Sequence, residues 1–162
     1  MTTPGGLVAD LLESTLEKGE EARFEVDGRS MLPLIRPGDT LCVRPPAGTE
    51  PRLGDVVAVR GMPGGGLLVH RVVRLHGGKL LLRGDNTTVD NGERAAGEIL
   101  GIVSGVERRG RDVWFGAGRW GGPVALLVRT GSVTRVNRVV LFVSRLVRGR
   151  RQSGEDTGRL PR

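Results

Sequence analysis

The apolar positions near the start of the chain repeat with the period of a helix. Between residues 6 and 18, apolar side chains recur at i, i+3 and i+4 spacing, with acidic residues between them. Gly19 follows this stripe and can end a helix in the left-handed conformation. The pattern therefore predicts an amphipathic helix over 6–18, within an N-terminal helix and lead-in of residues 1–22. The stripe consists of Leu7, Val8, Leu11, Leu12, Thr15 and Leu16.

From Arg23 onward the period changes to two. Apolar and polar residues alternate over 23–27, which is typical of a half-buried strand. Glycine and proline clusters separate further short apolar runs, and residues 76–78 have the composition of a hairpin turn. These features predict a mainly-β domain over 23–110, folded as a compact, coiled antiparallel β-sheet. The expected strands are 23–27, 40–44, 55–60, 67–75, 79–83 and 99–108.

The last third of the chain has a different pattern. Residues 111–131 are rich in glycine and are expected to form a connection. Over 132–149, valines and leucines fall on one helical face and arginines on the opposite face, which predicts a basic amphipathic helix. Such a helix can dock on the protein's own core, on a partner, or on an anionic membrane surface, and the pattern leaves these alternatives open. Residues 150–162 are expected to be a disordered tail.

Composition narrows the class of protein. The chain has 162 residues, enough for one domain with a real core, and a formal net charge of +7. A single cysteine excludes an intrachain disulfide and a cysteine zinc cluster, so we expect no metal and no cofactor. The sequence has no helix-turn-helix pattern and only 3% aromatic residues, which argues against a nucleic-acid partner. It has no secretory signal and no apolar run of membrane-spanning length, so the expected location is cytoplasmic, with membrane association through 132–149 left open.

Three motifs carry the candidate chemistry. They read G-R-S-M-L-P over 28–33, V-H-R-V-V over 69–73 and R-G-D-N-T-T-V-D over 83–90, with Gly-Asp pairs at 38–39 and 54–55. In this order and spacing they resemble the type I signal peptidase family, within the superfamily that also contains the self-cleaving SOS-type repressors. The resemblance covers about residues 24–103. It implies a serine endopeptidase with an antiparallel β core, of the branch that uses histidine as general base. Unlike most signal peptidases, this chain shows no transmembrane anchor.

The chemistry of the motifs suggests a role for two of their residues. A serine hydroxyl needs an adjacent base at neutral pH, and a histidine titrates in the useful range. Ser30 is the expected nucleophile and His70 the expected base, because alternation places His70 among apolar residues of its strand whereas His76 lies in the hairpin turn. The two lysines, Lys18 and Lys79, do not occupy the position before Arg71, so a serine–lysine pair is poorly supported.

By the resemblance, an acidic residue would orient the imidazole. Asp85 matches the acidic position of the family, and Asp90 is the competing choice. The resemblance also implies that the Ser30 backbone N–H stabilises the oxyanion and that Met31 and Pro33 line the substrate groove, although a core role for Met31 is equally consistent with the sequence. Many signal peptidases carry a hydroxyl residue two positions before the nucleophile, and this chain has Gly28 there.

Two functions follow from these residues. The first is a signal-peptidase-like serine endopeptidase that cleaves a peptide or preprotein, as in signal peptide processing. The alternative is a catalytically weak or inactive member of the superfamily that binds a peptide or protein partner, which the glycine at position 28 favours. The sequence does not identify the substrate.

Overall fold

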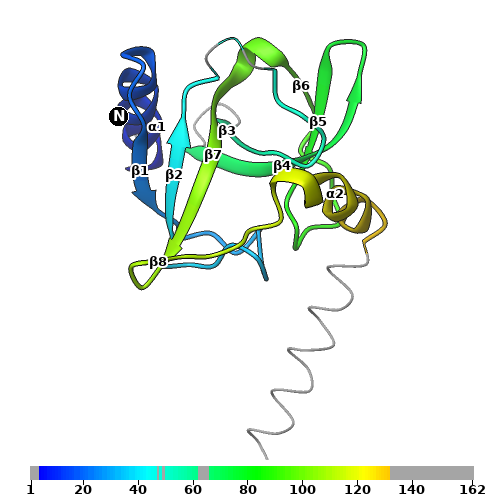
Figure 1. The fold of residues 1–162 in the computed structure, drawn as a ribbon. Helices are drawn as coiled ribbons and strands as arrows, with labels where there is room; N and C mark the ends of the chain where they lie inside the picture. Colours follow the sequence, from blue (N-terminus) through cyan, green and yellow to red (C-terminus); the bar gives the residue numbers. More distant parts are fainter. Residues whose placement is uncertain (1–3, 47, 49, 62–65, 132–162) are drawn as a thin grey trace, which may run out of the picture.

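The structure of the protein is a computed structural model that describes residues 4–46, 48, 50–61 and 66–131. Within these ranges the chain forms one curled antiparallel sheet with a helix at each end, which confirms the mainly-β fold expected from the sequence (Figure 1). The basic segment 132–149 and the tail 150–162 lie outside the described residues.

The first helix precedes all the strands, and the second follows them. The elements in chain order are α1 (Pro4–Glu17), β1 (Ala22–Glu25), β2 (Thr40–Arg44), β3 (Val56–Arg60), β4 (Leu67–His76), β5 (Lys79–Arg83), β6 (Glu93–Ala95), η1 (Ala96–Glu98), β7 (Ile99–Arg108), β8 (Arg111–Asp112), η2 (Gly118–Trp120) and α2 (Gly121–Arg129).

The strand order of the sheet is β1-β2-β7-β3-β4-β5-β6, with β8 paired to β7. Strand β4 is long and changes partner along its length, because β3 pairs with it over Leu67–Arg71 whereas β5 pairs with it from Arg71 to His76. The first residues of β4 therefore have no β5 strand beside them, and β1 lies at an outer edge of the sheet.

Apolar side chains on the two faces of β4 join different parts of the core. Alternation predicts that residues 68, 70 and 72 share one face, and Leu68 and Val72 do pack in the same cluster as Val57. Helix α1 covers part of the other core cluster with Leu12 and Leu16. The sequence periodicity thus correctly locates the helix and the strand, whereas Leu7 and Leu11 of the predicted helical stripe are exposed.

The segment 111–131, expected to be a glycine-rich connection, contains β8, η2 and α2. Helix α2 packs on β4 through Val124, Ala125 and Val128, which form a cluster with Val73. The helix approaches the sheet closely at its first residue: a side chain at Gly54, which has φ of +92°, would place its Cβ 2.0 Å from the carbonyl carbon of Gly121. A glycine at position 54 is therefore required for this contact.

Candidate active site

Ser30 lies in the long connection between β1 and β2, and two hydrogen bonds tie it to the loop after β5. The backbone N–H of Asn86 donates to the Ser30 carbonyl at 2.7 Å, and the Asn86 side-chain amide donates to the Arg29 carbonyl at 3.3 Å. A loop residue held on both sides has few conformations, so the Ser30 side chain is presented from a defined backbone position.

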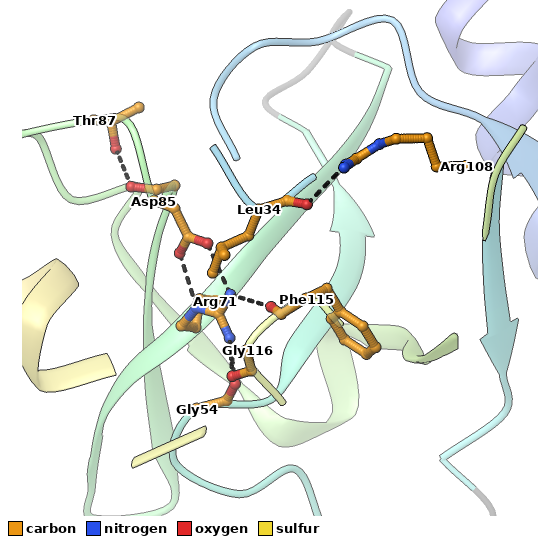
Figure 2. A network of polar contacts seen from close by, with 9 residues as sticks. Leu34, Gly54, Arg71, Asp85, Thr87, Arg108, Phe115 and Gly116 are labelled. Carbon is orange, nitrogen blue, oxygen red and sulfur yellow. Dashed lines mark hydrogen bonds and ion pairs between the residues drawn. The ribbon is translucent and has the colours of Figure 1, made fainter. Parts of the chain in front are cut away.

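The other end of this connection is anchored to β7. The Arg108 guanidinium donates to both carboxylate oxygens of Asp39 at 2.7 Å and to the Leu34 carbonyl at 3.1 Å, the second of which is drawn in Figure 2. Asp39 also accepts the backbone N–H of Arg36 at 2.8 Å, as expected for a turn residue. The serine is thus carried by a connection that is fastened at both ends.

His70 lies on β4 opposite Val57, with only 2% of its surface exposed. Gly84 lies close to both the imidazole and the serine side chain. A Cβ added at Gly84 would lie 3.0 Å from the His70 Nε2 atom and 3.0 Å from the Ser30 Cβ atom. The imidazole and the serine side chain therefore approach the same point in space from two segments far apart in the sequence. A residue larger than glycine at position 84 would push them apart.

The imidazole of His70 has little polar contact. Neither ring nitrogen has a hydrogen-bond partner of normal geometry among the described residues. Burial lowers the pKa of His70 from 6.5 to about 4, and the Asn91 side chain, which lies near the ring, opposes this effect by raising the pKa. The ring is therefore neutral at pH 7, which is the state that can accept a proton from a hydroxyl group.

Directly after His70, the fully buried Arg71 uses every hydrogen-bond donor of its guanidinium. Nε and Nη2 donate to the two carboxylate oxygens of Asp85 at 2.8 and 2.7 Å. The remaining donors go to backbone carbonyls of Gly54, Gly116 and Phe115 at 2.9, 2.8 and 2.9 Å (Figure 2). Arg71 thus joins the loop before β3, the loop after β5 and the segment that leads into α2.

The two acidic residues predicted to orient the base have arginines as their partners. Both carboxylate oxygens of Asp85 accept N–H groups of Arg71, as Figure 2 shows, and neither ring nitrogen of His70 has a hydrogen-bond partner of normal geometry among the described residues. The Asp90 carboxylate accepts a hydrogen bond from the Arg83 Nε at 2.5 Å. The alternation of β4 explains the first pairing, because it directs residues 70 and 71 to opposite faces of the strand, and Asp85 lies on the Arg71 side.

Sequence reasoning did not identify Asn91. Its backbone N–H donates to the Leu82 carbonyl at 3.0 Å, which holds it beside the end of β5. Since Leu82 pairs with Val72 on β4, this contact brings the Asn91 side chain near the next inward residue of that strand, His70. The sequence feature that could have pointed to Asn91 is its position directly after Asp90 in a polar segment.

An apolar groove of about 360 Å³ opens beside Ser30. The residues that line it come from α1, β1, the connection after β1, β2 and the start of β4: Val8, Phe24, Glu25, Val26, Asp27, Gly28, Ser30, Met31, Ile35, Leu41, Gly66, Leu67, Leu68 and Val69. Met31 lines this groove and is also a core residue with 3% exposure. Pro33 does not line this groove, and its carbonyl accepts a hydrogen bond from the Arg36 Nε at 3.2 Å.

Gly28 also lines the groove, and a Cβ added there would meet no atom within 4 Å. The position that holds a side-chain hydroxyl in many signal peptidases is therefore open space in this protein. Any oxyanion stabilisation here has to come from other donors.

Comparisons with known proteins agree with the motifs. The family model for Peptidase S24-like proteins matches residues 8–104, which includes most of α1, both candidate catalytic residues and Asn91. No curated protein and no solved structure matches the chain. None of the helices in the described ranges is long and apolar enough to cross a bilayer. The match supports the superfamily indicated by the sequence without distinguishing its signal peptidase branch. With well over half of its length matched, the chain belongs to the Peptidase S24-like family and contains a serine peptidase domain of that type.

Proposed function

We propose that the protein is a serine endopeptidase in which Ser30 is the nucleophile and His70 the general base. The observation that carries this proposal is the common approach of the His70 Nε2 and Ser30 Cβ atoms to the position above Gly84. The neutral imidazole takes the serine proton while the hydroxyl oxygen attacks the peptide carbonyl. It then returns the proton to the leaving amine, and water hydrolyses the acyl-enzyme.

The positions of the two lysines in the described chain favour histidine as the general base. Lys79 is exposed at the start of β5 and lies 3.6 Å from the Glu93 carboxylate. Lys18 is exposed directly after α1. Histidine therefore remains the side chain best placed to accept the proton of Ser30.

Asn91, rather than a carboxylate, is the residue best placed to orient the imidazole. Its backbone is held to Leu82, and its amide favours the protonated form of His70. A neutral amide can fix the tautomer and orientation of a catalytic histidine, as in the Cys-His-Asn arrangement of papain-like proteases. It stabilises the imidazolium less than a carboxylate would, which agrees with the lowered pKa.

The groove supports an extended peptide as substrate. The N–H of Val26 donates to the Asp39 carbonyl, and the Val26 carbonyl accepts the N–H of Gly38, so both groups face the segment that leads into β2. Backbone groups alternate in direction along a strand, so the N–H and carbonyl groups of Glu25 and Asp27 face outward. Leu67–Val69 form the facing wall on the part of β4 that β5 does not cover. A peptide between these edges can add as a strand, with its alternate side chains on apolar groove residues. Apolar segments such as those of signal peptides would fit this lining.

The test is hydrolysis of an extended-peptide library by the full-length protein, followed by mass spectrometry. Ser30→Ala and His70→Gln should each lower the cleavage rate by at least about a hundredfold, the scale of a lost base or nucleophile. The matched control is His76→Gln, at the exposed end of β4, which should cleave at the wild-type rate. Cleavage by Ser30→Ala at the wild-type rate would exclude the proposal.

A peptide-binding module without useful turnover is the second candidate. It is favoured by the empty position at Gly28 and by the lowered pKa of His70, since both weaken catalysis. Under this alternative, library peptides bind with the same affinity to wild-type and Ser30→Ala protein, and none is cleaved. Labelling of Ser30 by a reactive-serine probe would contradict it.

A further inference from the structure

Helix α2 is apolar on both of its faces. Val124, Ala125 and Val128 cover the sheet, while Leu126 and Leu127 on the opposite face are 60% and 51% exposed. A helix that is apolar all round normally has a covering layer on each side. The described chain supplies the layer beneath α2, and the outward face meets solvent.

Other exposed apolar residues surround the start of the same helix. Trp120, directly before α2, is 53% exposed. Leu53, 44% exposed, precedes Gly54, and Gly54 contacts the first residue of the helix. We call this outward surface the α2 face; it is formed by Leu53, Trp120, Leu126 and Leu127. Its side chains are of the type found where a protein enters the interfacial layer of a bilayer.

The charged residues directly before α2 and at its last residue are positive. The Arg119 guanidinium lies 5.6 Å from the centre of the Trp120 ring, and Arg129 ends the helix. No aspartate or glutamate occurs from residue 113 to residue 131. The whole chain has a formal charge of +7. This distribution complements an anionic lipid surface, since guanidinium groups pair well with phosphates.

We propose that the α2 face docks on anionic phospholipid at a membrane surface. Trp120 and the two leucines enter the interfacial layer, and Arg119 and Arg129 contact the phosphates. A second copy of the chain fits this face less well. Stable interfaces between proteins use roughly 20–30 residues a side, whereas the α2 face as defined consists of four side chains. This proposal does not depend on the peptidase activity.

The experiment measures binding of the full-length protein to large vesicles at about 0.1 M salt. One vesicle preparation contains phosphatidylglycerol and phosphatidylcholine, and the other contains phosphatidylcholine alone. The variant is Leu126→Ser with Leu127→Ser. The matched control is Leu7→Ser with Leu11→Ser on α1, because these leucines are 57% and 60% exposed on a different surface. Circular dichroism and urea unfolding establish that both variants fold.

Wild-type protein should bind the anionic vesicles, and the α2 variant should bind them at least about tenfold more weakly, the effect of losing two partly buried leucines. The α1 control should bind like wild type. In a Trp114→Phe background, Trp120 is the remaining tryptophan, and its emission should shift to the blue on binding.

Three results would overturn the proposal. The first is equal binding of wild type and the α2 variant, and the second is an equal loss in the α1 control. The third is Trp120 emission that is unchanged by vesicles or that shifts with protein concentration in their absence, since the latter would assign the α2 face to a second copy.

Discussion

The burial of His70 predicts that acid destabilises the protein by a defined amount. In the unfolded chain the imidazole titrates near its ordinary pKa of 6.5, whereas burial lowers the native pKa to about 4. Between these two values the unfolded chain binds a proton that the native protein does not bind. The free energy of unfolding therefore falls as the pH decreases from 6.5 to about 4, and this contribution is constant above pH 6.5.

The size of this effect follows from the difference between the two pKa values. Each pKa unit corresponds to about 1.4 kcal/mol, so the unpaired burial of His70 should cost about 3 kcal/mol across the window. That is a large part of the stability of about 5–15 kcal/mol that is typical of a single domain.

Urea unfolding at pH 7.5, 6.5, 5 and 4 measures this cost. Carboxylates also titrate in this range, so the informative quantity is the difference between wild-type protein and His70→Asn, which has no imidazole. The variant should lose about 3 kcal/mol less than wild type between pH 6.5 and 4. His76→Asn, at the exposed end of β4, should lose as much as wild type. Parallel pH profiles for wild type and His70→Asn would refute the reasoning.

Two further predictions concern the surroundings of the base. In Asn91→Asp the carboxylate should raise the pKa of the imidazole by about 1–3 units and move the acid limb of kcat/KM upward by the same amount; a limb that stays at about pH 4 would exclude Asn91 as its neighbour. Arg71→Met, which removes the arginine partner of the buried Asp85 carboxylate, should lower the free energy of unfolding in urea by about 3–5 kcal/mol. Arg83→Met removes a more exposed pair and should cost about 1 kcal/mol or less; equal losses would contradict this ranking.

Much of the fold could be predicted from periodicity because burial follows side-chain direction. The i, i+3, i+4 spacing located α1, and alternation along β4 placed His70 on an inward face. The change to a period of two at Arg23 also placed the motif residues Ser30 and His70 in one predicted mainly-β domain. Alternation works in these cases because each prediction concerns one strand or one helix and the face that it buries.

Pairing between segments was beyond this reasoning. Alternation puts Arg71 on the face opposite His70, but the sequence does not say which carboxylate meets the guanidinium. A bulge in the β4–β5 pairing between Val72 and Arg74 also shifts the register just before the loop that contains Asp85 and Asn91. The spacing of acidic residues along the sequence therefore did not indicate which polar side chain would reach the imidazole.

Helix α2 escaped prediction for a different reason. Its nine residues begin with two glycines and a proline, and the apolar residues that follow have no polar face to mark the helical period. Proline is compatible with the first turn of a helix, so Pro123 lies in the first turn of α2 without breaking it. What stabilises α2 is its contact with Val73 on β4, which lies far away in the sequence.

The hydrogen bonds of Arg71 also set the length of chain that can fold as an autonomous unit. Two of its five donors end on the Phe115 and Gly116 carbonyls, beyond the last residue of the family match. A fragment ending at residue 104 would leave these buried N–H groups without acceptors, at about 1–3 kcal/mol each, and would uncover Val73. The smallest self-sufficient domain therefore extends through Val128, so the family boundary and the folding boundary differ.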